Sequence, residues 1–154
     1  MDLSTIGVKF GWAVETTKGT KPTSFTQIKG CISIGGVEIS KDNIETTPLE
    51  VNKKTYVGGY EDTGGTLTTG FNYNDDFIAA WTALQTASTA GAKDGKRTWF
   101  TAWHPNMSKA NFYVVEPGSI GSPEYAPGNA LQVTITNTLN EFPDPSEAIE
   151  PTAA

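Results

Sequence analysis

Residues Ile44–Tyr73 read IETTPLEVNKKTYVGGYEDTGGTLTTGFNY, and they set the architecture we expect for the whole chain. The second part predicts a β-strand, because Leu67, Phe71 and Tyr73 alternate with threonine and asparagine at the period of a half-buried strand. The first part is a long polar connection, and such a connection within a compact domain is usually functional or disordered. The alternative is an Ω-loop that packs on its own side chains. Its apolar residues are Ile44, Leu49, Val51, Tyr56, Val57 and Tyr60.

Similar alternation on both sides of this stretch predicts further strands. Val8–Val14 alternates large apolar residues with Lys9, Gly11, Ala13 and Glu15, which indicates one buried and one mostly polar face. Shorter strands are expected over residues 31–39, 98–104 and 111–116, with a bulge or tight turn at Gly35-Gly36. The clearest strand is 130–139. Its apolar side carries Leu131, Val133, Ile135 and Leu139, and its polar side carries Gln132, Thr134, Thr136 and Thr138.

One helix is predicted over residues 74–90. Asn74 suits the N-cap, and Asp75 and Asp76 lie in the first turn, where carboxylates complement the helix dipole. Phe77, Trp81 and Leu84 form one apolar stripe, and Gly91 is expected to end the helix. The elements together predict a mainly β fold, an antiparallel β-sandwich or small barrel of six to eight strands. One α-helix would flank it, and the long loop would leave it.

The length of 154 residues predicts one domain. We expect residues 1–140 to form the β-sandwich domain and residues 141–154 to form an acidic, proline-rich C-terminal arm that is mobile when the subunit is alone. All eleven basic residues lie at or before Lys109, whereas six of the seventeen acidic residues follow it. Arg97 is the one arginine. This charge pattern argues against a nucleic-acid reader, whose affinity comes mostly from neutralising phosphates.

The sequence offers little for catalysis. Cys31 is the one cysteine and His104 the one histidine, so no intrachain disulfide and no His/Cys metal set can be assembled. The paired carboxylates have simpler explanations at the helix start, in the loop and in the arm, and the glycine doublets do not match a phosphate loop. We therefore expect no enzyme activity and no cofactor. The opening residues do not have a signal-peptide pattern, and no apolar run is long enough to insert into a membrane, so synthesis in a cytoplasm is expected.

Four tryptophans suggest an alternative of another class, a glycan-binding β-sandwich module. Aromatic platforms do occur on such folds. Here Trp12 lies on the apolar side of its strand, Trp81 lies on the helix stripe, and Trp99 and Trp103 share one side of theirs. This placement favours core positions over an exposed platform.

The order of short motifs resembles the tail tube proteins of long non-contractile-tailed phages. The match in order and spacing extends from about Ser4 to Leu139, and each motif is weak alone. The family often has proline or leucine near the glycines, where this chain has Val57 and Tyr60. The matching motifs are Glu45-Thr46-Thr47, Tyr56-Val57-Gly58-Gly59-Tyr60, Asp62, Gly64-Gly65, Phe71-Asn72-Tyr73 and Asn74-Asp75.

The resemblance implies two packed sheets, a flanking helix and a long assembly loop. It implies a structural protein of the virion tail, made in the host bacterial cytoplasm. Six subunits would form a ring whose inner sheets join into a β-barrel, and stacked rings would deliver DNA without binding it specifically. Tape measure and tail terminator or tip proteins would be its partners. The alternative within this class is the tube protein of a contractile tail or a secretion system.

Two sets of residues follow as candidate sites. The subunit interface is expected at Thr46, Thr47, Leu49, Val51, Tyr56, Val57, Tyr60, Phe142 and Ile149. The channel lining is expected at Gln132, Thr134, Thr136 and Thr138. A wall without cations leaves DNA mobile. A solvated outer surface is the alternative for the second set.

Overall fold

The computed structural model describes residues 2–153, which form ten strands and one helix. The bounds are β1 Lys9–Val14, β2 Thr26–Gln27, β3 Cys31–Ile34, β4 Ser40–Glu45, β5 Tyr56–Asp62, β6 Thr66–Asn72, α1 Asp75–Lys93, β7 Thr98–Trp103, β8 Lys109–Glu116, β9 Gln132–Leu139 and β10 Asp144–Glu147. Eight strands form one sheet, and β4 and β5 form a separate pair. The named strands all pair antiparallel, which confirms the predicted mainly β architecture with a single helix.

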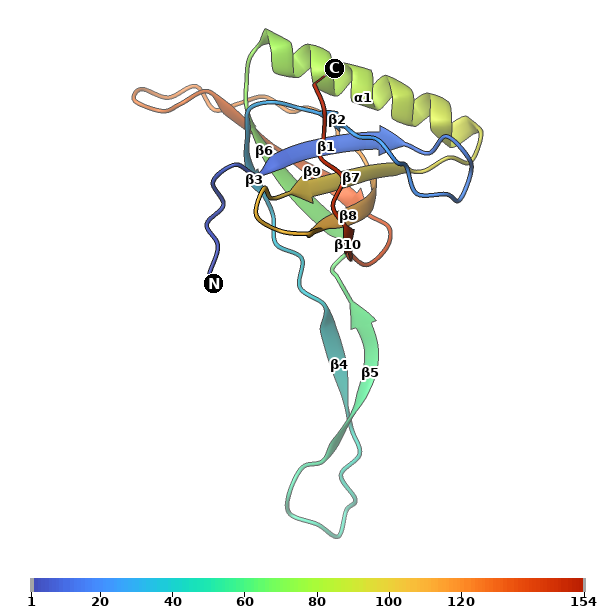
Figure 1. The fold of residues 1–154 in the computed structure, drawn as a ribbon. Helices are drawn as coiled ribbons and strands as arrows, with labels where there is room; N and C mark the ends of the chain where they lie inside the picture. The colour runs from blue at the N-terminus through green and yellow to red at the C-terminus, as the bar shows by residue number, and fades with distance from the viewer. Residues whose placement is uncertain (1, 154) are drawn as a thin grey trace.

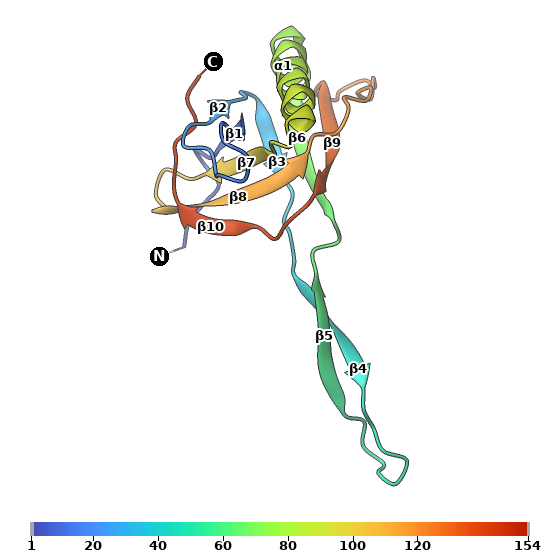
Figure 2. The ribbon, with the colours of Figure 1, turned by 90° about the vertical axis from the view of Figure 1, so that its right-hand side faces the viewer.

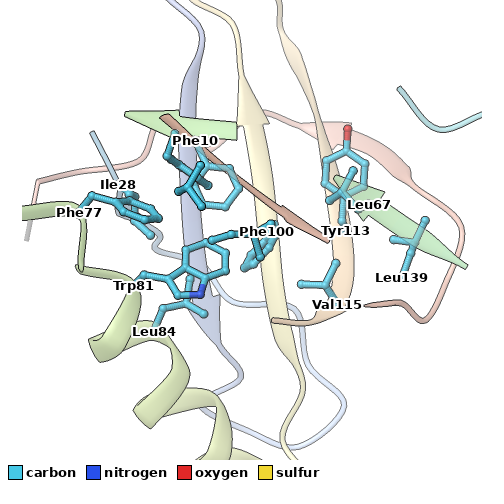
Figure 3. Close-up of a cluster of buried hydrophobic side chains, with 13 residues drawn as sticks. Phe10, Ile28, Leu67, Phe77, Trp81, Leu84, Phe100, Tyr113, Val115 and Leu139 are labelled. Atoms are coloured by element: carbon cyan, nitrogen blue, oxygen red, sulfur yellow. The ribbon is translucent and has the colours of Figure 1, made fainter. Parts of the chain in front are cut away.

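The main sheet has the strand order β2-β1-β7-β8-β9-β6-β3, and β10 pairs with β8. β8 and β9 pair through two positions, Val115 with Leu139 and Glu116 with Thr138. The sheet turns at this short junction, so that β9, β6 and β3 cross behind β1, β7 and β8 (Figures 1 and 2). The space between the two halves holds the main core, to which both halves and α1 contribute (Figure 3).

Helix α1 closes this core along one side of the sheet. The Asn74 side chain caps it by accepting a hydrogen bond of 2.8 Å from the Phe77 amide. Phe77, Trp81 and Leu84 are buried as predicted. The helix continues past Gly91 to Lys93, contrary to the predicted end. A Cβ on Gly91 would lie 2.6 Å from Val14 Cγ1, so glycine here permits close packing on β1 and does not end the helix.

The opposite face of β1, β7 and β8 is also buried. A second core consists of Ala13, Phe25, Trp99, Ala110, Phe112 and Val114. Its cover is the C-terminal segment, whose Ala148 and Ile149 pack against it. The prediction of a mostly polar second face on β1 is therefore wrong. Gly11 contacts the segment so closely that a Cβ there would lie 2.7 Å from Pro151.

The C-terminal arm, which was expected to be mobile when the subunit is alone, is paired with the sheet in this structure. β10 pairs with β8 from Asp144 opposite Phe112 to Glu147 opposite Lys109. Beyond it, Thr152 bridges to β2, and the Gln27 amide donates to the Thr152 carbonyl at 2.7 Å. The segment is low in apolar residues, but backbone pairing and its few apolar contacts hold it on the sheet.

The predicted long loop is largely a β-hairpin. β4 and β5 form a twisted ribbon that projects well away from the body of the subunit (Figures 1 and 2). Only residues 46–55 form its tip, which is closed by the Thr46 amide donating to the Thr55 carbonyl at 2.8 Å. Sequence periodicity missed these strands because both faces of the ribbon are exposed, so polar and apolar residues have no reason to alternate.

Candidate assembly surfaces

The first candidate surface is the β4–β5 hairpin. Its register places Ile44 opposite Val57 and Glu45 opposite Tyr56, with an irregularity between Lys41 and Asn43. Every residue of β4 is exposed, and β5 is exposed apart from the half-buried Gly59. Within residues 2–153, β4 and β5 pair only with each other. Most of the ribbon surface therefore faces solvent in the isolated subunit.

The two central glycines of β5 leave space on both faces of the ribbon for side chains of β4. A Cβ on Gly58 would lie 2.7 Å from Lys41 Cδ, and a Cβ on Gly59 would lie 3.2 Å from Ile44 Cδ1. Long side chains of β4 thus fold across the ribbon over each glycine. This arrangement presents the methylenes of Lys41 on one face and Ile44 on the other, where a neighbouring surface can contact them.

The hairpin collects seven of the nine residues that the sequence predicted for the subunit interface. Thr46 and Thr47 are structural at the tip, because Thr46 Oγ1 lies 3.1 Å from Thr55 Oγ1 and Thr47 Oγ1 accepts from the Thr55 amide at 2.9 Å. Large apolar side chains are left in solvent, with relative exposures of 104% for Leu49 and 89% for Tyr60. The others on the hairpin are Val51, Tyr56 and Val57, each exposed.

The remaining two predicted interface residues lie in the C-terminal segment, away from the hairpin. Phe142 is 47% exposed and remains available to a partner. Ile149 is half-buried and packs on the second core of its own chain. Its partner in this structure is therefore intramolecular, because the docked segment turns Ile149 toward β1, β7 and β8.

The second candidate surface is a polar face on β6 and β9, which we call the threonine face. Its residues are Thr66, Thr68 and Asn72 of β6 and Gln132, Thr134, Thr136 and Thr138 of β9, all exposed. Paired positions are Thr66 with Thr138, Thr68 with Thr136, and Asn72 with Gln132. The Gln132 amide donates to Asn72 Oδ1 at 3.4 Å.

The sequence predicted the β9 half of this face and missed the β6 half as part of it. The signal was present, because Thr66, Thr68 and Asn72 alternate with buried residues of the same strand. What the sequence lacked was the pairing of β6 with β9. Gly70 faces Thr134 and lies under the Ser33 side chain, since a Cβ on Gly70 would meet Ser33 Oγ at 2.6 Å.

Carboxylates lie at the borders of the threonine face. Glu116 of β8 is exposed and is the register partner of Thr138, which places it on the same side of the sheet. Glu124 lines a cavity of about 500 Å³ together with Gln132 and Thr134. The seven side chains of the face are uncharged, so its electrostatic field comes from these flanking acids.

Arg97 joins two acidic groups near the second core. The buried Glu15 carboxylate accepts from the Arg97 guanidinium at 3.1 Å, from the Arg97 amide at 2.8 Å and from Trp99 Nε1 at 3.2 Å. On its other side the guanidinium donates to Glu141 at 2.6 Å. Burial alone raises the pKa of Glu15, but hydrogen bonds from Arg97, Trp99 and Gly19 outweigh it, so the pKa lies below its ordinary value.

Residues 2–153 hold no group of three or more His, Cys, Asp or Glu side chains that could bind a metal ion. Burial raises the pKa of the Cys31 thiol to about 11, so the thiol stays protonated at neutral pH. His104 Nδ1 accepts from the Asn106 amide at 3.0 Å, and its Nε2 contacts the Ser4 carbonyl at 2.5 Å.

Trp81, Trp12 and Trp99 lie in or against the two cores as predicted, whereas Trp103 belongs to neither core and lies under the Lys9 cation. Trp81 and Trp99 are buried, and Trp12 and Trp103 are half-buried. Trp99 belongs to the second core rather than the first. Over residues 2–153, no helix combines the length and the apolar character needed to cross a membrane.

The fold is similar to chains in three solved particles. A chain of the native gene transfer agent virion has a TM-score of 0.51 at 12% identity, covering 79% of this chain and 88% of its own. A chain of the sheath-tube complex of an extracellular contractile injection system, PVC, has a TM-score of 0.54 at 14% identity, covering 91% and 89%. A chain of the anti-feeding prophage baseplate has a TM-score of 0.52 at 8% identity, covering 96% and 98%. No family model and no curated protein matches the sequence. At these identities the likeness shows a shared fold.

Proposed function

We propose that this chain is a structural subunit of a phage-tail-like tube, which assembles with copies of itself. The observation that carries the proposal is the β4–β5 hairpin, an exposed ribbon with apolar residues that project from the body of the fold. The shared fold with chains of a virion, a sheath-tube complex and a baseplate supports the same conclusion. Its role is structural rather than catalytic.

An isolated two-stranded hairpin is marginally stable in water, because it has no core of its own. Its outer edges also present unpaired backbone groups that attract other strands. The β4–β5 hairpin has both properties, and its tip exposes Leu49 completely. Contact with a neighbouring subunit or the next ring would bury Leu49, Val51, Tyr56, Val57 and Tyr60 and stabilise the ribbon. Phe142 is proposed to join this interface from the C-terminal segment.

The threonine face is proposed to line the channel of the tube. Hydroxyl and amide groups form transient hydrogen bonds with water and offer no fixed positive charge to a phosphate. Glu116 and Glu124 at its borders add repulsion for a polyanion. A wall of this chemistry lets DNA slide without specific binding. The alternative is a solvated outer surface, and lysine substitutions at Thr134 and Thr136 distinguish the two.

The finer form of the proposal is the major tail tube protein of a siphophage. Head-to-tail contacts close rings when the rotation between subunits allows it, and six subunits per ring with stacked rings would form the tube. In this form residues 1–140 build the wall, and residues 141–154 form a C-terminal arm that helps to connect copies. DNA delivery, tape measure and terminator or tip partners, a location in the virion tail and synthesis in the host bacterial cytoplasm belong to the same proposal.

A second candidate is the tube protein of a contractile tail or injection system. It is favoured by the likeness to chains of the contractile injection system and of the anti-feeding prophage baseplate. Electron microscopy of particles that contain this chain separates the two. A contractile sheath around the tube supports the second candidate, and a bare tube supports the first.

Negative-stain microscopy of concentrated protein tests the proposal. Wild-type protein should form rings or tubes, whereas a variant with Leu49–Lys54 replaced by a Gly/Ser linker of equal length should stay monomeric and folded. The matched control is Asn52→Ser, which changes the same exposed tip without removing its apolar residues. Normal tubes from the linker variant would exclude the hairpin from assembly. Wild-type protein that binds glycans and stays small at every concentration would favour the lectin-like alternative.

A further inference from the structure

The C-terminal segment 140–153, which we call the strap, adds ion pairs with the body to its backbone and apolar contacts. Arg97 donates to Glu141 at 2.6 Å near its start, and Lys9 lies 2.7 Å from Glu150 near its end. Between them Lys21 donates to Ser146. The acidic charge that dominates the end of the sequence thus meets three cations of the body.

Lys21 lies between the strap and the second core. Burial lowers the pKa of Lys21, and the carboxylates of Asp144 and Glu147 act in the opposite direction. Its Nζ also lies 3.3 Å from the centroid of the Phe112 ring, which is in the second core. The cation therefore connects the apolar floor of the site to the acidic strap above it.

The backbone of the strap completes the site at the β8 edge. The Ala148 amide donates to the Ser108 carbonyl at 3.0 Å, so that these opposed residues form a hydrogen-bonded pair. Bonded and non-bonded pairs alternate along an antiparallel ladder, which makes Pro145 opposite Asn111 a non-bonded pair. Proline is tolerated there because its missing amide hydrogen would point away from β8.

The connection between β9 and β10, residues 140–143 at the start of the strap, is short. Its first residue, Asn140, donates to the Val114 carbonyl at 2.9 Å. Phe142 follows with about half of its surface in solvent, and Pro143 precedes β10. The strap makes its ion pairs, ladder bonds and apolar contacts with the body. The same contacts can form when the strap comes from a second copy, so only the connection and the local concentration decide between the two states.

We propose that the strap is exchangeable: the β8 edge and the second core form an acceptor site for the strap of a neighbouring copy. The isolated subunit keeps its own strap in this site. In an assembly, neighbouring acceptor sites are held at high effective concentration, and strap exchange then connects subunits by β-pairing and ion pairs. The exchange in assembled material rests on the proposed tube function, whereas the acceptor site itself is a property of the single subunit.

Cysteine cross-linking in the full chain tests the exchange. Lys109 and Glu147 are both exposed, are register partners, and form a non-bonded pair by the same alternation, which places their Cβ atoms close enough for a disulfide. Chains with Lys109→Cys and chains with Glu147→Cys are mixed, concentrated until they assemble, and oxidised. The matched control mixes Lys109→Cys with Thr89→Cys, an exposed position on α1. Wild-type protein reports the background from Cys31.

The proposal predicts about tenfold or more mixed disulfide dimer over the control, because exchange places the two thiols together at high effective concentration. A chain with both substitutions should close on itself when dilute. Mixed dimer at the control level in assembled material overturns exchange, and so does a double variant that fails to close when dilute. Tubes without mixed dimer would support the proposed tube function and exclude exchange. Mixed dimer without tubes would support exchange and contradict the tube function.

Discussion

The indole nitrogen of Trp81 donates a hydrogen bond of 2.9 Å to the backbone carbonyl of Gly118, which lies outside the sheet between β8 and β9. Gln85 donates to the same carbonyl at 3.0 Å. The Gly118 amide in turn donates to Asn137 Oδ1 at 2.9 Å, and Asn137 donates to the Leu67 carbonyl at 3.0 Å. Through Gly118, the helix is connected to both long strands of the threonine face.

Gly118→Ala should destabilise the subunit, because the new Cβ would lie 2.1 Å from the Thr136 carbonyl oxygen. Relieving this overlap requires a backbone shift at the point where α1 and Asn137 meet, with a cost of about 2–3 kcal/mol. The measurement is urea unfolding followed by tryptophan fluorescence. Gly121→Ala is the matched control, since its Cβ meets no atom within 4 Å. Equal stability of the two variants would contradict the contact.

Trp81→Ala should lower the free energy of unfolding by about 3–5 kcal/mol. The side chain has 0% exposure and contacts the rings of Phe77 and Phe100 (Figure 3). It also contacts the ring of Phe71. Thr82→Ala, on the exposed side of the same helix, should cost far less. A thermal midpoint of Trp81→Ala that equals wild type would show that α1 does not depend on this anchor.

Low pH should lower the free energy of unfolding of the subunit by protonating Glu15. Its folded pKa lies below its ordinary value of 4.5, so its stabilising contribution is present above pH 4.5 and is lost as pH falls through the folded pKa. Glu15→Gln removes that titration, and the slope of unfolding free energy against pH should flatten in the acid range below 4.5. Urea titrations at a series of pH values measure this slope. Glu45→Gln, on the exposed hairpin, is the matched control for the loss of one carboxylate.

Lysines on the threonine face should make assembled tubes retain DNA. Thr134→Lys combined with Thr136→Lys adds two cations at exposed positions of β9, so folding should be preserved. If the face lines the channel, the assembled tubes should bind DNA, with affinity that falls as salt rises, and infect poorly. Thr86→Lys with Thr89→Lys on α1 adds the same charge elsewhere. Normal infectivity without DNA retention would place the threonine face on the outside.

Sequence periodicity predicted the elements that have one exposed and one buried side. β9 alternates buried and exposed residues without exception from Gln132 to Leu139, and α1 buries the stripe that the sequence indicated. The burial of Asn137 shows the limit of this reasoning. Its position is set by the amide of Gly118 and the carbonyl of Leu67, and neither partner is near it in sequence.

Periodicity missed the hairpin strands and the second buried face of β1, and in both cases the two faces do not differ in burial. Both faces of the hairpin strands are exposed to solvent. Both faces of β1 are buried, because the strap packs over Ala13 and Gly11. The strap itself looked disordered by composition. Its order comes from backbone pairing with β8 and β2 and from apolar contacts, with ion pairs to Arg97 and Lys9 added, and only the folded chain brings these partners near it. The interface and channel residues depend on neighbouring copies, so their roles stay predictions.

The meeting of β2 with Thr152 has a consequence for synthesis on the ribosome. The Thr152 amide donates to the Phe25 carbonyl, and its carbonyl accepts from Gln27, although more than a hundred residues of chain separate the partners. β1 also has partners that are distant in sequence, because it pairs with β7 and its Gly11 packs under Pro151. Contacts so distant in sequence close slowly, and here the last of them cannot form until translation has passed residue 152. The nascent chain therefore emerges with an open second face, which is covered only after Pro151 and Thr152 have been translated.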